Sequence, residues 1–211
     1  MRFIVIDGLD AAGKDTHALM IKERYEAAGE KVILRSHPTS DNPFGRKAKK
    51  ALLGTGKKNK FIASTYYAAD IFRSVKRHYG KADTVIFVRY LCGVAYLPSP
   101  FHKSLYNIFS GILPTTEYLF FLDVSPRESL KRIECRDEVE MFENLESLQE
   151  VREKVIDLVK DWYIIDTDQP MDKAHNDIDR ILDVLDSGGD LDENKPSVLH
   201  DLKERTSSPR R

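Results

Sequence analysis

A glycine-rich loop near the N-terminus constrains this chain more than any other feature of its sequence. The loop has the spacing G-x-x-x-x-G-K over residues 8–14, and it lies between an apolar run at residues 3–6 and a segment with helical spacing. A phosphate-binding loop requires this strand-to-helix context. Its glycines let successive N–H groups face phosphate oxygens, and the helix adds its positive end. The sequence therefore predicts binding of a nucleoside triphosphate.

The residues that end this loop would contact the donor phosphates and their metal. Lys14 supplies a point charge for the outer phosphates. The next position, where a hydroxyl usually ligates Mg²⁺, holds Asp15, and Thr16 follows. A carboxylate suits Mg²⁺, but Asp15 could instead cap the helix or mark a weakened site. We predict ATP and Mg²⁺ as cofactors, with Asp15 and Thr16 as metal ligands. The predicted cofactor-binding residues are Gly8, Leu9, Asp10, Ala11, Ala12, Gly13, Lys14, Asp15 and Thr16.

Strands and helices alternate along the chain. Five strands are predicted from apolar runs, at residues 3–6, 32–34, 84–88, 118–124 and 163–166. Helices are predicted at residues 16–28, 61–79 and 177–185, after the cap Ser125, and from Ser147 to about residue 161. This alternation predicts a doubly wound α/β fold around a five-stranded parallel sheet. Residues 1–186 are expected to form one domain, and the polar residues 187–211 a mobile tail.

Composition and charge exclude several other classes of protein. The 211 residues have a net charge of −1, so no global charge favours nucleic acid or an anionic membrane. Cys92 and Cys135 lack a CxxC spacing and predict thiols in a reducing compartment. No signal peptide or membrane-length apolar run is found, so we expect a cytoplasmic protein without membrane or nucleic-acid partners. The basic run at residues 46–60 is interpreted as a solvated helix face that attracts anionic nucleotides.

Further motifs, taken in order, resemble the thymidylate kinase family of P-loop nucleoside monophosphate kinases. The resemblance runs from about residue 1 to residue 185 and implies a P-loop NTPase fold with a helical lid. The motifs that carry it are residues 3–10, Tyr67-Ala68-Ala69-Asp70, Arg89-Tyr90, Ala95-Tyr96, residues 121–126, and Arg132, Arg136 and residues 141–143.

The resemblance implies a role for each matched side chain. Asp10 would approach the sugar of a nucleoside monophosphate, Tyr67 would stack on its base, and Tyr96 would complete the substrate site. Arg89 would bridge the donor and acceptor phosphates. The implied reaction is ATP-dependent phosphorylation of dTMP to dTDP, and a homodimer is implied as well. The catalytic residues would be Lys14, Arg89, Arg132 and Arg136.

Other roles, unrelated to catalysis or substrate binding, remain open for four of these residues. Arg132 and Arg136, one turn apart on the helix capped by Ser125, could close over the transferring phosphoryl group or pair with surface glutamates such as Glu128. Arg89 could form an ion pair at a strand end. Tyr67 could be an ordinary core aromatic.

Some positions depart from the family pattern. The family has an aspartate at Val88 and an arginine at Ile71, and Arg73 lies roughly 200° further round the helix than Ile71. Gly93 or Cys92 falls where a serine is usual. Two alternatives therefore stay open: a polyphosphate-dependent nucleotide kinase of the second class, whose loop is similar to residues 10–14, and a nucleotide-binding protein without turnover.

Overall fold

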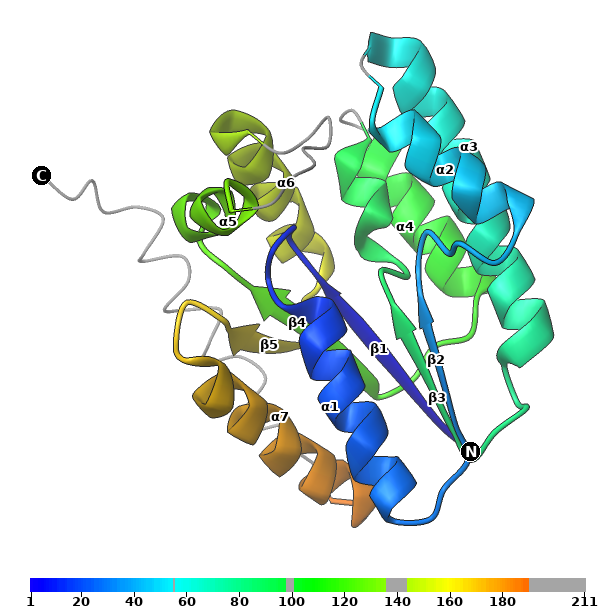
Figure 1. The fold of residues 1–211 in the computed structure, drawn as a ribbon, viewed down its shortest axis with the longest axis vertical. Helices are drawn as coiled ribbons and strands as arrows, with labels where there is room; N and C mark the ends of the chain where they lie inside the picture. The colour runs from blue at the N-terminus through cyan, green and yellow to red at the C-terminus, as the bar shows by residue number, and fades with distance from the viewer. Residues whose placement is uncertain (55, 98–100, 136–143, 190–211) are drawn as a thin grey trace, which may run out of the picture.

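One parallel sheet organises the molecule (Figure 1). The structure is a computed structural model, and it describes residues 1–54, 56–97, 101–135 and 144–189. The sheet has five strands in the order β2-β3-β1-β4-β5, which confirms the predicted doubly wound α/β fold. The strands are β1 (Arg2–Gly8), β2 (Val32–Ser36), β3 (Thr84–Val88), β4 (Tyr118–Asp123) and β5 (Tyr163–Asp166). α1 and α7 lie across one face, and α3, α4 and α6 lie behind the sheet in this view.

The helices include two that the sequence pattern did not predict as separate elements, α2 and α4. In α4, Leu105, Ile108, Phe109 and Ile112 follow a helical apolar spacing, so the sequence carries a signal for this helix that the prediction did not use. α3 begins at Gly56 and α7 at Met171, earlier than residues 61 and 177. The helices are α1 (Lys14–Ala27), α2 (Pro43–Leu52), α3 (Gly56–His78), the 3₁₀ helix η1 (Cys92–Tyr96), α4 (Phe101–Ile112), α5 (Pro126–Ile133), α6 (Leu145–Leu158) and α7 (Met171–Asp186).

Two predicted helix starts had different outcomes. Ser125 caps α5, where its Oγ accepts the N–H of Glu128 at 3.3 Å, as predicted. The start at Ser147 is wrong, because the Oδ1 of Asn144 accepts the N–H of Ser147 at 3.0 Å and α6 begins at Leu145. Asparagine caps a helix as well as serine does, and the earlier start adds most of a turn.

The parallel register brings the carboxyl ends of the strands to one edge of the sheet. Ile6 of β1 is paired with Val88 of β3, and both side chains are fully buried. The phosphate loop follows β1 at this edge, and η1 follows β3. Ligands of open α/β sheets bind outside the carboxyl ends of the strands, so the fold itself places the site here.

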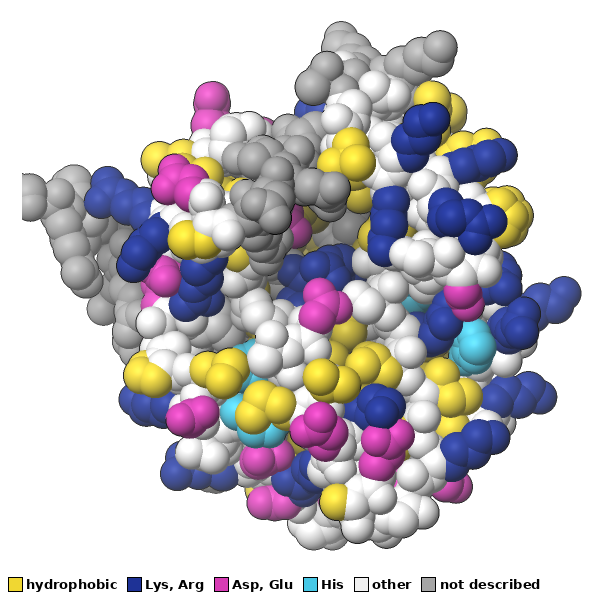
Figure 2. Space-filling view, in the orientation of Figure 1, with side chains coloured by type: hydrophobic (Ala, Val, Ile, Leu, Met, Phe, Trp, Pro, Cys, Tyr) yellow, Lys and Arg dark blue, Asp and Glu magenta, His cyan; other side chains and the backbone are white. Residues whose placement is uncertain are grey.

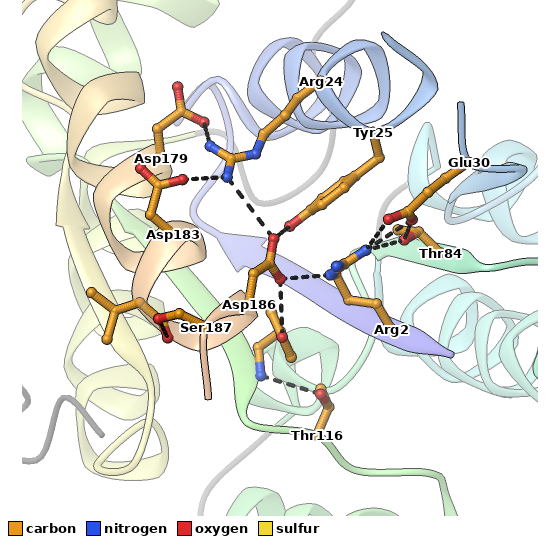
Figure 3. A network of polar contacts seen from close by, with 12 residues as sticks. Arg2, Arg24, Tyr25, Glu30, Thr84, Thr116, Asp179, Asp183, Asp186 and Ser187 are labelled. Atoms are coloured by element: carbon orange, nitrogen blue, oxygen red, sulfur yellow. Dashed lines mark hydrogen bonds and ion pairs between the residues drawn. The ribbon is translucent and has the colours of Figure 1, made fainter. Parts of the chain in front are cut away.

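A polar network closes the opposite edge, where the strands begin (Figure 3). The guanidinium of Arg2 donates to Glu30 at 2.8 Å and, through Nε, to Asp186 at 2.7 Å. The hydroxyl of Tyr25 donates to the other oxygen of Asp186 at 3.0 Å, and Arg24 donates to Asp179 at 2.9 Å. These contacts join β1, α1 and α7 at their far ends, so the last helix is fixed away from the phosphate loop. Of the predicted tail, residues 190–211 lie outside the described residues.

His17, which is buried against His175 between α1 and α7, makes folding stability depend on pH. Nδ1 of His17 lies 3.4 Å from Nδ1 of His175. Burial, together with His175, lowers the pKa of His17 to about 4. As the pH falls below about 6.5 the unfolded chain is protonated first, so stability is lost down to the folded pKa. We expect His17 to lower the free energy of unfolding by about 2 kcal/mol between pH 7 and pH 5.

Urea unfolding at several pH values measures this effect. The His17→Gln variant should lose less stability than the wild type over the same pH interval, since the substituted side chain does not titrate. Equal losses in the two proteins would contradict the assignment to His17.

Cys92 and Cys135 are free thiols, as expected. Within the described ranges, every helix is too short or too polar to cross a membrane.

Candidate active site

The phosphate loop joins β1 to α1 in a conformation that needs its glycines. Gly13 is the N-cap residue of α1 with a φ of 81°, in the left-handed region that favours glycine. A Cβ on Gly8 would overlap the backbone oxygen of Leu122 on β4. No side chain caps the start of α1 at Gly13, so the backbone of the first turn presents its N–H groups toward the loop. Such a helix end favours a bound anion.

The side chain of Lys14 lies within this loop. Its side chain is buried, and Nζ donates to the carbonyl oxygens of Gly8, at 3.0 Å, and Leu9. Burial, with a smaller contribution from the charge of Arg89, lowers the pKa of Lys14 to about 8. The ammonium is therefore charged at neutral pH and held within the loop that the glycines form.

Asp15 and Arg89 form an ion pair beside the loop. Nη1 of Arg89 lies 2.9 Å from Oδ2 of Asp15 and 3.0 Å from Oγ of Ser36. Ser36 donates in turn to Oδ1 of Asp15 at 2.5 Å. Burial opposes ionisation of Asp15, but Arg89 and Ser36 together lower its pKa. Asp15 is thus a carboxylate on the loop side of the site, and the strand-end ion pair considered for Arg89 is present.

The predicted substrate residues Asp10, Tyr67, Arg89 and Tyr96 lie close to one another. The hydroxyl of Tyr96 donates to Oδ2 of Asp10 at 2.8 Å. The hydroxyl of Tyr67 donates to the carbonyl oxygen of Arg89 at 2.7 Å. All four residues line one cavity, whereas Thr16 is exposed and does not line it.

The cavity has a volume of about 1030 Å³ and runs from the loop toward α3 and α4. Its loop end is lined by Lys14 and Asp15, and its far end by apolar side chains that include Ile71 and Phe109. Arg73 does not line it, and its Nη1 lies instead 3.8 Å from Asp41. Ile71 lines the cavity and Arg73 does not, so Arg73 does not occupy the place of Ile71.

Cationic side chains gather on α2 and α3 beside the cavity. Figure 2 shows Lys and Arg side chains gathered over α2 and α3. Lys47 and Lys50 are exposed on α2, while Lys49 and Lys60 line the cavity. This placement supports the interpretation of the basic run as a helix face that attracts anionic nucleotides.

Asp7 is a site residue that the sequence reasoning missed. It is 2% exposed, and its Oδ2 accepts the N–H groups of Tyr90, Leu91 and Cys92 at 3.1, 2.9 and 3.1 Å. The turn that carries Arg89 toward η1 is therefore held from β1. A carboxylate at the end of a strand buried on both faces was the available signal, because such a group needs partners.

Asp70 is a second buried carboxylate, and it fixes the loop between β2 and α2. Its oxygens accept the N–H of Thr39 at 2.6 Å, the hydroxyl of Thr39 at 2.7 Å and the amide of Asn42 at 2.6 Å. His37 and Pro38, in the same loop, line the cavity. The Ala-Asp motif on α3 thus positions part of the cavity wall.

Arg132 braces the phosphate loop. Its Nη2 donates to the carbonyl oxygen of Thr167 at 2.8 Å and its Nη1 to that of Ala11 at 3.3 Å. Its Nε is 3.0 Å from Oε1 of Glu128, the surface pairing that was the alternative to a lid role. Arg132 lies in the last turn of α5, and the helix face that it is expected to share with Arg136 stays a prediction. Arg136 and residues 141–143 of the expected lid lie outside the described residues.

The chain is similar to members of one family in both sequence and fold. The family model described as thymidylate kinase matches residues 6–178. A probable thymidylate kinase of Pyrobaculum calidifontis is 29% identical over 191 residues, covering 86% of this chain and 95% of the relative. Another, of Thermococcus kodakarensis, is 28% identical over 211 residues, covering 87% and 98%. The structure of thymidylate kinase from Candida albicans matches with a TM-score of 0.70 at 17% identity, covering 86% of this chain and 91% of that chain. The chain belongs to the thymidylate kinase family, and the nucleoside monophosphate kinase expected from its ordered motifs is confirmed.

Proposed function

We propose that this chain transfers the terminal phosphoryl group of ATP to dTMP. The observation that carries this function is a single cavity that joins the Lys14 loop to the Asp10–Tyr96 pair and the ring of Tyr67. Its volume of about 1030 Å³ lies at the upper end of the range for ligand pockets, which suits two substrates. Phosphoryl transfer requires groups that position the substrates and stabilise charge. The side chains that line this cavity are of these kinds.

The donor side is built from the phosphate loop. Lys14 and the N–H groups at the start of α1 would bind the donor phosphates, and Arg132 and Ser129 hold the loop backbone in place. Asp15 would hold Mg²⁺, since its ionised carboxylate lines the cavity, and Thr16 is the second proposed ligand. The metal, when bound, neutralises charge on the phosphates.

The acceptor side is built from η1, the loop and α3. Tyr96 orients the carboxylate of Asp10 toward the cavity, where it would accept a hydrogen bond from the sugar. Tyr67 would stack on the base, and Ile71 makes this end apolar. Arg89 would lie between the two phosphate groups. Arg136 stays a proposed catalytic residue on the strength of the resemblance.

A panel of nucleoside monophosphates tests the function. With ATP, Mg²⁺ and an ADP-coupled readout, dTMP should give the highest kcat/KM. Absence of turnover with every monophosphate, in protein shown to be folded, would refute it. Turnover with polyphosphate in place of ATP would favour the polyphosphate-dependent kinase. Binding of ATP by calorimetry without turnover, and without gain in Val88→Asp, would favour the protein without turnover.

The buried amine of Lys14 gives ATP binding a specific pH dependence. Because its pKa is about 8 in the protein alone, the ammonium loses its proton as the pH rises through 8. A neutral amine does not pair with phosphate, so we expect ATP affinity to be flat below pH 8 and to fall by up to about tenfold per pH unit above it. Calorimetry from pH 7 to pH 9 measures the slope. Lys14→Arg, whose guanidinium stays charged, should bind without that slope, and a flat wild-type profile would contradict the assignment.

We propose further that the protein is cytoplasmic and forms a homodimer. Ile108 and Ile112 of α4 are 51% and 65% exposed, and the nearby ring of Phe72 is 40% exposed. Phe72 packs edge-on against Phe109 of α4, with ring centroids 6.1 Å apart. Exposed apolar side chains that gather on adjacent helices favour association. Sedimentation should give twice the monomer mass for the wild type and a smaller species for Ile112→Lys, and a monomeric wild type would refute the dimer.

A further inference from the structure

Arg89, the first residue after β3, has a backbone conformation that a residue with a Cβ rarely adopts. Its φ is 58°, in the left-handed region where the Cβ crowds the backbone. Such a conformation persists where its surroundings hold it. The N–H of Arg89 donates to the carbonyl oxygen of Ile6 at 3.0 Å, and its own carbonyl oxygen accepts the hydroxyl of Tyr67 at 2.7 Å. The residue is thus held from β1 on one side and from α3 on the other.

The direction of the Arg89 side chain follows from this backbone conformation, because φ sets where the Cα–Cβ bond points. The guanidinium turns toward the phosphate loop, where Nη1 lies 2.9 Å from Asp15 and 3.0 Å from Ser36. A return of φ to a negative value would redirect the bond and take the guanidinium away from both partners. The Tyr67 hydroxyl therefore affects the position of the Arg89 guanidinium, although the two groups are not in contact.

Gly93 gives the Tyr67 hydroxyl its room. A Cβ on Gly93 would lie 2.9 Å from Cε1 of the Tyr67 ring and 3.3 Å from Cζ, so any larger residue would push the ring away from the Arg89 carbonyl. Burial, together with the charge of Asp7, raises the pKa of Tyr67 well above its usual value. The phenol therefore keeps its proton at neutral pH and remains a donor.

We propose that the Tyr67 hydroxyl is a positioning group that holds Arg89 in its left-handed conformation and so aims the guanidinium at the phosphate loop. This inference rests on the proposed function, in which Arg89 lies between the phosphates. In addition to base stacking by the ring, Tyr67 would then have a second role that depends on its hydroxyl alone. The base-stacking surface is left intact when the hydroxyl is removed, so the two roles can be separated.

Tyr67→Phe makes that separation. We expect kcat to fall about fivefold to tenfold, the factor that one neutral hydrogen bond contributes, with the KM for dTMP within about twofold. In an Arg89→Ala background the same substitution should cause no further loss, because the hydroxyl acts through Arg89. Tyr66→Phe is the matched control, since Tyr66 is the neighbouring tyrosine of α3 and contacts Lys47 outside the cavity. It should leave kcat unchanged.

Two results would overturn the proposal. One is an equal loss from Tyr67→Phe in the wild-type and Arg89→Ala backgrounds. The other is a rise in KM with kcat unchanged, which would mean that Tyr67 serves the base alone. Gly93→Ala should reproduce the fall in kcat by moving the ring, and thermal unfolding identifies any variant that has not folded.

A measurement without turnover separates this proposal from the proposed function. The Nε–H signal of Arg89, assigned by its loss in Arg89→Lys, reports the guanidinium in ¹⁵N NMR spectra. It should shift in Tyr67→Phe and stay in place in Tyr66→Phe. If the wild type phosphorylates no monophosphate, the proposed function fails while this signal still tests the positioning. An unchanged signal in Tyr67→Phe refutes the positioning whatever the activity.

Discussion

Replacing Lys14 with alanine should lower kcat by about a thousandfold, the range seen when one preorganised charge-stabilising group is lost. The ammonium is held by the Gly8 and Leu9 carbonyls where the loop opens into the cavity, and no other lysine of the described residues has this position. ATP affinity should fall as well, since Lys14 would contact phosphate before and during transfer. The coupled ADP assay and calorimetry measure the two effects separately.

The stability of Lys14 variants shows whether the fall in kcat comes from the missing ammonium or from unfolding of the protein. A depressed pKa means that burial of the charged amine costs free energy at pH 7. Lys14→Met, which keeps most of the volume, should therefore unfold at no lower urea concentration than the wild type. Lys22→Ala, on the same helix but paired with Glu26 at the surface, should keep its activity. A Lys14→Ala enzyme with more than a tenth of wild-type turnover would contradict the role given to this residue.

Replacing Asp7 with alanine should destabilise the fold by about 4 kcal/mol. The substitution leaves the buried N–H groups of Tyr90, Leu91 and Cys92 without their acceptor, and each such group costs about 1–3 kcal/mol. The turn between β3 and η1 should loosen, so the orientation of Arg89 and Tyr96 should be lost with it. Urea unfolding measures the free energy, and hydrogen exchange at residues 90–92 measures the turn.

Two matched variants sharpen this second prediction. Asp7→Asn keeps a carbonyl oxygen that can accept some of the three bonds, so its loss should be smaller, about 1–2 kcal/mol. Asp157→Ala removes an exposed carboxylate paired with Lys103 and should change stability by less than about 0.5 kcal/mol. Equal losses in Asp7→Ala and Asp157→Ala would show that the three N–H bonds do not hold the turn.

The contacts of Asp15 in the structure narrow the roles that the sequence left open for it. As a sequence feature it raised three readings: a metal ligand, a weakened site or a helix cap. In the structure its carboxylate is bonded to Arg89 and Ser36, two residues from the ends of neighbouring strands. An unpaired charge beside the phosphates is thereby avoided, which removes one reason to regard the site as weakened.

The sequence alone determined the parts of this protein that depend on neighbours along the chain. The loop at residues 8–14, the five strands and the Ser125 cap all follow from spacing, apolar period and local hydrogen bonding. The helical spacing of Leu105, Ile108, Phe109 and Ile112 indicates α4 as well, although the prediction did not use it. The start of α6 was misplaced because Asn144 and Ser147 are both good caps.

Only the tertiary structure decided which side chains meet at the loop. Asp15 and Arg89 are 74 residues apart, and Asp7 holds backbone groups 83 to 85 residues away. Such partners are chosen by the parallel register, which brings strand ends to one edge whatever their separation in sequence. Arg132 of α5 likewise donates to the carbonyl oxygen of Ala11, 121 residues away in the sequence. Sequence patterns report on residues that are a few positions apart. The contacts of the site join residues that only the pairing of the strands brings together.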